Sequence, residues 1–214
     1  MDFELVIFDL DGVLVDTSPC HELAYNELWK LMDIAGPRYE SIAGRKTREV
    51  VEEYGARINV DPARFGEWVQ FKQELARTHL NSAQIAFDDS AECLQRLTGA
   101  GQLLALGTGA SRKTAEMVLR RFGWDAVFSV VVTGDDVMTG KPAPDIYSVA
   151  IERSGASAER TLIVEDSDAG LEAAVAAEAY SVSVRSGARI DHRRFIGAFP
   201  DISTMLAALE KGEL

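Results

Sequence analysis

The stretch VIFDLDGVLVDTS, residues 6–18, decides how the rest of the chain is read, because two acids interrupt an apolar run. The residues from Val6 to Phe8 are typical of a buried strand. Asp9 and Asp11 stand at the end of this run, two positions apart. Since alternate residues of a strand face the same side, a turn that begins here could aim both carboxylates inward. These two aspartates are therefore the first candidate functional residues.

The composition bounds the class of protein. The chain has 214 residues, 47% of them hydrophobic, which is enough for one sizeable core and a small second one. With 34 acidic and 22 basic side chains the net charge is -12, which excludes a general nucleic-acid partner. Cys20 and Cys93 form neither a disulfide framework nor a metal-ligand spacing. With no basic leader and no apolar run of roughly 18 residues, we expect a cytoplasmic protein without a membrane partner. We expect a monomer.

Apolar runs alternate with helical patterns over most of the chain. The runs are LVIF (5–8), QLLALG (102–107), FSVVVTG (128–134), TLIVED (161–166) and YSVSV (180–184). Such runs predict parallel strands covered on both faces, and hence an α/β sheet. Ser111 and Gly123 are typical boundaries of one intervening helix, and Pro142 and Gly155 of another, while the alanine-rich stretch 167–179 favours a third.

One region breaks the alternation. Between about Ser18 and Leu80 there is no convincing strand pattern, only helical periodicity. The simplest interpretation is a helical insertion after the first strand. We therefore predict a helical cap domain at residues 17–81 and an α/β core domain made of residues 1–16 and 82–214.

Side chains that can take part in catalysis or bind a metal follow four of the predicted strands. Asp9 and Asp11 follow the first, Thr108 the second, Lys141 the third, and the pair Glu165 and Asp166 ends the fourth. Taken singly, each of these is typical of a turn or a helix cap. Open parallel sheets bind ligands at the carboxyl ends of their strands, so the ordered set indicates an active site at that edge.

These residues resemble the haloacid dehalogenase superfamily of phosphotransferases, in its branch with a helical cap inserted after the first motif. FDLDGVLVDT (8–17) resembles the first motif, Thr108 the second, KPAPD (141–145) the third and VEDSDAG (164–170) the fourth. Within the branch, the chain is most similar to β-phosphoglucomutases, sugar-phosphate phosphatases and phosphoglycolate phosphatases. The resemblance implies a Rossmann-like parallel sheet as the core.

The resemblance also implies catalytic roles. Asp9 would be the nucleophile that attacks phosphorus to form an aspartyl-phosphate, and Asp11 the general acid and base. A carboxylate needs no deprotonation to attack at neutral pH, and a second one can protonate the leaving oxygen and then activate water. Thr108, with neighbouring backbone N–H groups, would hold the transferring oxygens. Lys141 would balance the charge of the phosphate and the nucleophile.

A divalent cation is expected at the same place, because a phosphate dianion would be repelled by the carboxylates alone. Magnesium prefers hard oxygen ligands and bridges phosphate to carboxylates. By the family pattern its ligands would be the carboxylates of Asp9 and Asp166 and the backbone carbonyl of Asp11. Glu165 would bind the ion directly or through water.

Substrate contacts should come in part from outside these motifs, because Mg²⁺ and Lys141 do not neutralise three carboxylates and a phosphate dianion. The insertion offers basic side chains, including Arg48, and so does the segment after Thr108. A solvated basic turn is the alternative for each of them. His21 matches a histidine that mutase-like members place against the acid/base residue; a surface or capping role is its alternative. The predicted substrate-binding residues are Thr108, Gly109, Arg45, Lys46, Arg112 and His21.

Three functions are open at this point. The first is a magnesium-dependent phosphatase acting on a small phosphate ester, such as a sugar phosphate. The second is a β-phosphoglucomutase-like mutase, which Thr17 and His21 favour and Gly109 does not. The third is a non-enzymatic sensor of a phosphate ligand, which the complete set of motif residues disfavours.

Overall fold

The computed structural model describes residues 3–42, 45, 47–58 and 61–214. It contains two compact units: the segment ending at Asp16 together with Ala86–Leu214, and Thr17–Ile85. The second unit runs four residues beyond the boundary expected at residue 81. The assignment of the two units as catalytic core and cap stays a proposal.

The first unit is built on a six-stranded sheet. Its strands are β1 (Leu5–Phe8), β2 (Leu103–Gly107), β3 (Val130–Val132), β4 (Thr161–Glu165), β5 (Tyr180–Val184) and β6 (Phe195–Phe199). The order is β3-β2-β1-β4-β5-β6, and every neighbouring pair is parallel. The predicted α/β fold with a Rossmann-like parallel sheet is confirmed. The sequence predicted β1 to β5, whereas β6 was not predicted.

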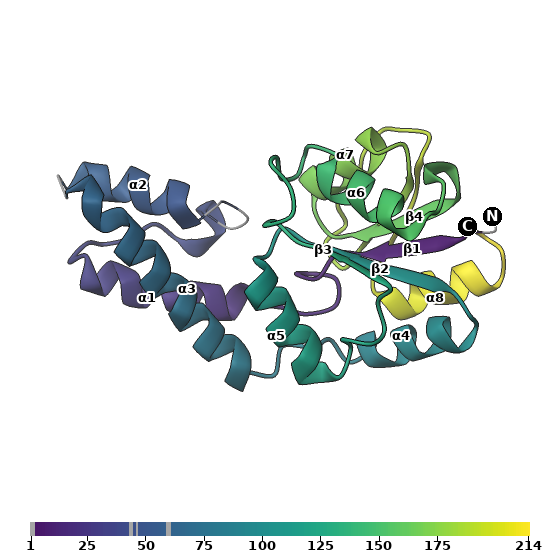
Figure 1. The fold of residues 1–214 in the computed structure, drawn as a ribbon, viewed down its shortest axis with the longest axis horizontal. Helices are drawn as coiled ribbons and strands as arrows, with labels where there is room; N and C mark the ends of the chain where they lie inside the picture. The colour runs from purple at the N-terminus through teal and green to yellow at the C-terminus, as the bar shows by residue number, and fades with distance from the viewer. Residues whose placement is uncertain (1–2, 43–44, 46, 59–60) are drawn as a thin grey trace. The chain divides into compact units, whose positions relative to one another are not determined.

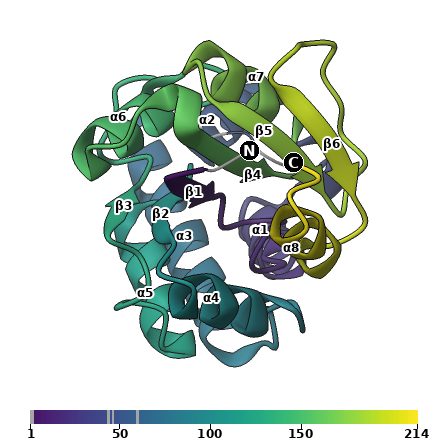
Figure 2. The same cartoon turned by 90° about the vertical axis from the view of Figure 1, so that its right-hand side faces the viewer.

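Helices cover both faces of this sheet, with α6 and α7 on one side and α4, α5 and α8 on the other (Figures 1 and 2). They are α4 (Ser90–Gly99), α5 (Arg112–Phe122), α6 (Asp145–Ser154), α7 (Asp168–Ala176) and α8 (Ile202–Glu210). Leu5 and Ile7 pack in the core beneath α6 and α7. Val6 and Phe8 alternate to the other face and are also fully buried. Burial on both faces explains why this strand is a continuous apolar run.

The helix boundaries follow from local signals. The Ser111 Oγ atom accepts a hydrogen bond from the Thr114 N–H at 3.3 Å, and Gly123 ends α5 at φ 70°, so both predicted caps are confirmed. The α6 helix begins at Asp145, later than the predicted start at Pro142. The reason is a second proline, Pro144, which disfavours helical backbone at the residue before it.

The second unit is helical, as predicted for the insertion. It contains α1 (Ser18–Leu31), α2 (Thr47–Arg57) and α3 (Phe65–Ser82), with single 3₁₀ turns at Tyr39–Ser41 and Pro62–Arg64, and its described residues form no strand. The α1 and α2 helices both pack on α3. Aromatic side chains dominate this core: the rings of Tyr25 and Trp29 stack with centroids 5.4 Å apart. Across the described segments of the chain, no helix combines the length and apolarity needed to cross a membrane.

The left-handed backbone at Gly123 gives a first prediction. Gly123→Ala should lower the free energy of unfolding by about 1 kcal/mol, because a Cβ atom disfavours positive φ. Gly99→Ala is the matched control, since Gly99 ends α4 outside the left-handed region and a Cβ there meets no atom within 4 Å. Chemical denaturation of the three proteins measures both effects. Equal stability of the Gly123 variant and the wild type would contradict the assigned role of this glycine.

Candidate active site

The carboxylates of three residues meet where β1 and β4 end. These strands are adjacent, with Phe8 paired to Val164, so the next residues along each strand are Asp9 and Glu165. The Asp9 N–H donates to the Val164 carbonyl at 3.0 Å. Carboxylate oxygens of Asp9, Glu165 and Asp166 lie within 4.8 Å of one another. The parallel register therefore brings together acids that are more than 150 positions apart in sequence.

Lys141 lies between two of these carboxylates. Its Nζ atom donates to Asp9 Oδ1 at 2.6 Å and to Glu165 Oε1 at 2.6 Å. The ammonium also lies 4.9 Å from the centroid of the Tyr147 ring. The lysine side chain is only 14% exposed, so these two ion pairs are largely shielded from solvent. The loop between β3 and α6 thus supplies the positive charge of the cluster.

Glu165 is the most completely held of the acids. Its Oε1 atom accepts from Lys141 and from the Tyr147 hydroxyl. Its Oε2 atom accepts from the Asp166 N–H at 2.9 Å and from the N–H and hydroxyl of Ser167 at 3.3 and 3.1 Å. The absence of a side chain at Gly170 is required here, because a Cβ atom would lie 1.9 Å from the carboxylate. The sequence analysis did not identify Tyr147, since nothing local marks a hydroxyl on α6 as a partner of β4.

The charges in this cluster do not balance. Burial raises the pKa of Asp9 well above its usual value, although Lys141 opposes the shift. Burial, followed by the Glu165 carboxylate, raises the pKa of Asp166 to about 7. Burial also acts to raise the pKa of Glu165, but Lys141 and the hydrogen bonds lower it overall. One ammonium thus faces three carboxylates, and their hard oxygen atoms fit a divalent cation such as Mg²⁺.

Asp11 lies in the turn that follows β1. The Gly12 N–H donates to the Val15 carbonyl at 2.7 Å, which closes this turn. Gly12 has φ 80°, and a Cβ atom there would lie 1.9 Å from Asp166 Oδ2. After burial, the Asp11 carboxylate is among the charges that raise the pKa values of Asp9 and Asp166, so it lies within electrostatic reach of both.

Thr108 stands at the same edge, directly after β2. It is fully buried, its N–H donates to the Val132 carbonyl at 3.0 Å, and its Oγ1 atom accepts from the Ala110 N–H at 3.1 Å. Gly109 lies in close contact with the loop after β3, because a Cβ atom on Gly134 would lie 2.6 Å from the Gly109 carbonyl oxygen. Thr108 and Gly109 therefore lie in a loop that packs tightly against the loop after β3.

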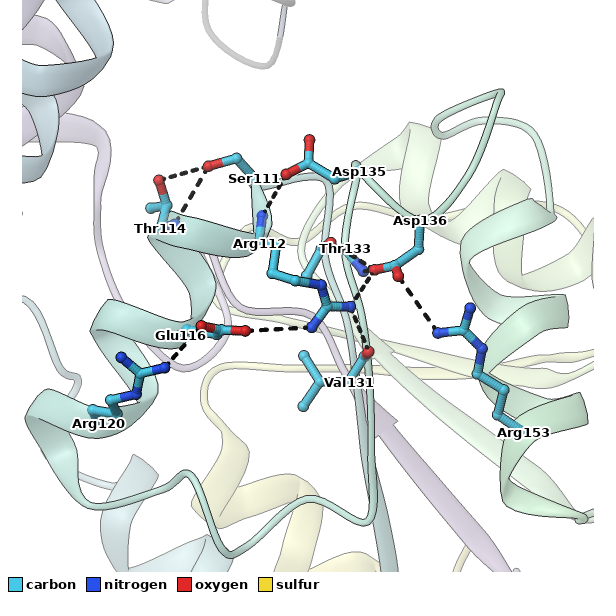
Figure 3. Close-up of polar contacts among 10 residues, drawn as sticks. All are labelled: Ser111, Arg112, Thr114, Glu116, Arg120, Val131, Thr133, Asp135, Asp136 and Arg153. Carbon is cyan, nitrogen blue, oxygen red and sulfur yellow. Dashed lines mark hydrogen bonds and ion pairs between the residues drawn. The ribbon is translucent and has the colours of Figure 1, made fainter.

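Arg112, a predicted substrate contact, is engaged in other interactions (Figure 3). Its Nη2 atom lies 2.5 Å from Asp136 Oδ2 and donates to the Val131 carbonyl at 3.3 Å. Its Nη1 atom lies 3.7 Å from Glu116. A substrate phosphate would have to displace these partners, and substrate contact by Arg112 stays a prediction. Sequence spacing showed a cation near Thr108 but not the carboxylates around it.

Two arginines of the second unit, Arg45 and Arg48, also have acidic partners. Arg45 Nη2 lies 2.8 Å from Glu53, and Arg48 Nη1 lies 3.3 Å from Glu52. Both arginines are at least one third exposed, so these ion pairs are weak and can exchange for a ligand. Lys46 lies outside the described residues. Substrate contacts by Arg45 and Lys46 stay predictions.

His21, on α1, contacts a buried lysine to which the sequence analysis assigned no role. Its Nδ1 atom is 2.8 Å from Lys72 Nζ, and that ammonium lies 4.2 Å from the centroid of the Tyr25 ring. A lysine ammonium only donates, so Nδ1 accepts and Nε2 carries the ring proton. Burial, helped by the Lys72 charge, lowers the pKa of His21 to about 3. The predicted contact of His21 with Asp11 stays a prediction.

With this geometry established, comparison with known proteins is informative. A family model described as "Haloacid dehalogenase-like hydrolase" matches residues 6–184. The chain belongs to the haloacid dehalogenase-like hydrolases. This confirms the resemblance and the prediction that the protein is a hydrolytic enzyme.

Named relatives of this hydrolase include phosphatases and a β-phosphoglucomutase, the latter from Bacillus subtilis and 30% identical over 197 residues, covering 85% of this chain and 83% of the relative. This hydrolase is 32% identical over 181 residues to the phosphorylated carbohydrates phosphatase of Thermotoga maritima, covering 81% of each chain. It is 30% identical over 190 residues to the fructose-1-phosphate phosphatase YqaB of Escherichia coli, covering 84% of this chain and 95% of the relative. The crystal structure of CbbY from Rhodobacter sphaeroides in complex with phosphate superimposes with a TM-score of 0.82 at 26% identity, over 97% of this chain and 99% of that one.

The hydrogen bond from Tyr147 to Glu165 gives a second prediction for this hydrolase. Tyr147→Phe keeps the ring in the core but removes a buried donor, so the free energy of unfolding should fall by about 1–2 kcal/mol. Tyr180→Phe is the control, because no hydrogen bond is recorded for the Tyr180 hydroxyl among the described residues. Urea denaturation compares the two. An equal loss in both variants would show that the Glu165 contact adds nothing.

The neutral state of His21 gives a third prediction. The folded pKa of about 3 lies below the reference value of 6.5, so below pH 6.5 the unfolded chain takes up a proton that the folded chain does not. This histidine's contribution to stability is therefore present above pH 6.5 and is lost as the pH falls toward 3. His21→Asn retains an acceptor for Lys72 but does not titrate, so its stability should decline less than that of the wild type. Denaturation midpoints from pH 7 to pH 4 measure the difference, with exposed His192→Asn as control. Parallel pH curves for all three proteins would refute the prediction.

Proposed function

We propose that this hydrolase is a magnesium-dependent phosphatase that removes the phosphoryl group from a small phosphorylated metabolite, such as a sugar phosphate, through an aspartyl-phosphate at Asp9. The observation that carries the proposal is the buried cluster in which Lys141 lies 2.6 Å from both Asp9 and Glu165. The names of the relatives, a phosphorylated carbohydrates phosphatase and a fructose-1-phosphate phosphatase, support a sugar phosphate as substrate.

The first half of the reaction uses Asp9 and Asp11. Lys141 favours the ionised form of Asp9 and fixes its Oδ1 atom, which leaves Oδ2 for attack. Attack forms a bond from Asp9 to phosphorus and breaks the bond from phosphorus to the ester oxygen. Asp11 protonates that leaving oxygen, so the alcohol departs neutral. Thr108 and the N–H groups of its loop bind the transferring oxygens.

The second half regenerates the enzyme. Asp11, now ionised, takes a proton from a water molecule whose oxygen attacks phosphorus. The bond between phosphorus and Asp9 then breaks, and orthophosphate leaves. The same two residues thus serve both steps, with Asp11 acting first as acid and then as base.

The proposed metal ligands follow the family pattern, supported by the clustering of the Asp9 and Asp166 carboxylates. Asp9, Asp166 and the Asp11 carbonyl would hold Mg²⁺, which supplies charge neutralisation for the phosphate oxygens. Glu165 has two donors on Oε1 and three on Oε2, so its lone pairs are used. We therefore assign Glu165 to the orientation of Lys141; ligation of the ion by Glu165, directly or through water, would displace one of these donors.

The proposal also covers the role of the helical second unit, the oligomeric state and the cellular location. The helical unit would act as a cap that excludes water and supplies Arg45, Lys46 and His21 to the substrate. We propose a monomeric, cytoplasmic enzyme with no nucleic-acid or membrane partner. The mutase alternative is weaker, because Gly109 offers no side chain to a second sugar phosphate and the relatives at 32% and 30% identity described above are named phosphatases; a β-phosphoglucomutase of Bacillus subtilis, also 30% identical, keeps the alternative open.

The test is product analysis by phosphorus NMR. The purified protein and Mg²⁺ are incubated with a panel of sugar phosphates and other small phosphate monoesters. The proposal predicts orthophosphate, lost on chelation of the metal and reduced by about 10³-fold or more in Asp9→Asn. Asp168→Asn, an exposed carboxylate two positions beyond Asp166, is the matched control and should retain activity.

Two outcomes would change the assignment. Phosphate that migrates between sugar hydroxyls with little orthophosphate would establish the mutase. Turnover by Asp9→Asn at the wild-type rate would exclude Asp9 as nucleophile.

A further inference from the structure

A second carboxylate cluster lies beside the active site and contains none of the predicted metal ligands. Its centre is Asp136, in the turn after β3 (Figure 3). Asp136 Oδ2 accepts from the N–H and hydroxyl of Thr133 at 2.8 and 2.6 Å and from Arg112 at 2.5 Å. Asp136 Oδ1 lies 3.5 Å from Arg153. The side chain is 16% exposed, so one partly buried carboxylate joins α5, the turn after β3 and α6.

These contacts fasten two loops to each other. The Arg112 N–H donates to Asp135 Oδ2 at 2.8 Å, and the Gly134 N–H donates to the Ala110 carbonyl at 2.9 Å. The close approach of Gly134 to the Gly109 carbonyl leaves no room for a side chain between the loops. The loop 108–111 and the loop 133–141 therefore behave as one pair at the carboxyl edge of the sheet.

Each of these loops carries a residue of the proposed reaction. The first begins at Thr108, and the second ends at Lys141, five positions after Asp136. Between them, Val137 packs on the core, whereas Met138 is 94% exposed. Among the described side chains of residues 133–140, Asp136 makes the most polar contacts, so it is the main side-chain anchor of the chain that leads to Lys141.

The Asp136 side chain is ionised at neutral pH. Partial burial acts to raise its pKa, but hydrogen bonds from Thr133 and Arg112 prevail and lower it to about 2. The carboxylate is therefore ionised whenever the enzyme is folded at neutral pH, and Arg112 stays paired with it.

We propose that Asp136 is a positioning residue for phosphoryl transfer: through Arg112 and Thr133 it holds the paired loops that carry Thr108 and Lys141. Asp136 does not contact the reacting atoms. This inference rests on the proposed function and assigns Arg112 to the same network rather than to the substrate. Loss of the anchor should displace Lys141 from Asp9, and misplacement of a reacting group by about 1 Å costs on the order of 10²-fold in rate.

The test is the isosteric variant Asp136→Asn. It keeps an acceptor oxygen for Thr133 but removes the charge that holds Arg112 and Arg153. The expected result is a fall in kcat of about 10- to 100-fold with KM within about 3-fold of wild type. Hydrogen exchange should become faster in peptides covering 108–112 and 133–141. Glu116→Gln is the matched control: Glu116 also contacts Arg112, at 3.7 Å, but anchors neither loop, so kcat should stay within about 2-fold.

The outcomes separate this inference from the proposed function. A variant with a lower melting temperature but wild-type kcat, assayed well below that temperature, overturns the inference because Asp136 is then only structural. If the wild type itself hydrolyses nothing in the panel, the proposed function fails, and hydrogen exchange alone decides whether Asp136 anchors the loops: unchanged exchange overturns it, faster exchange in both loops supports it. If Asp136→Asn does not fold, Arg112→Gln tests the same pair with the same readouts.

Discussion

The contact of Lys141 with both Asp9 and Glu165 is the interaction on which the active site depends. Two carboxylates at the ends of adjacent strands would repel each other in a buried setting, and burial alone would keep one of them protonated. The ammonium between them lowers the pKa of Glu165 and opposes the rise in the pKa of Asp9, and the Tyr147 hydroxyl and the Asp166 N–H hold Glu165 from its other sides. Asp9, the proposed nucleophile, is thus held by a partner that comes from a different part of the chain.

The sheet order explains how these residues come together. Because β1 is central, with β2 on one side and β4 on the other, the loops after three neighbouring strands converge at one edge. A fourth loop, after β3, reaches this edge through the pairing of the 108–111 and 133–141 loops. Glycines allow the closest approaches: Gly12 against Asp166, Gly170 against Glu165 and Gly134 against the Gly109 carbonyl. The strand order and these close backbone approaches therefore bring the charged side chains of the site together.

Sequence patterns predicted what is encoded locally. Strands buried on both faces appear as apolar runs, and Ser111 and Gly123 act on the helix that they bound, so these features were accessible from spacing alone. The β6 strand was missed although its sequence, FIGAF, is apolar, because the glycine at its centre, Gly197, weakens the strand pattern. The start of α6 was placed early because the effect of Pro144 outweighs that of Pro142.

The features that sequence could not predict are contacts between distant segments. The partner of Glu165 on α6, the partner of Arg112 in the turn after β3 and the contact of His21 with Lys72 are separated by 18, 24 and 51 positions. Motif matching correctly brought Asp9, Lys141, Glu165 and Asp166 into one cluster. It could not show the carboxylates of Asp136 and Glu116 that the fold brings against Arg112, because these contacts depend on the fold and not on motif spacing.

The most direct test of the central claim is to find where the phosphoryl group goes during turnover. The enzyme is mixed with Mg²⁺ and its best substrate, quenched in acid within one turnover and digested, and the peptide that contains Asp9 is weighed by mass spectrometry. The account predicts that this peptide gains the mass of one phosphoryl group, that hydroxylamine removes it and that Asp11→Asn slows its loss. Steady release of orthophosphate with no modification of Asp9, or with the phosphoryl group on another residue, would contradict the account.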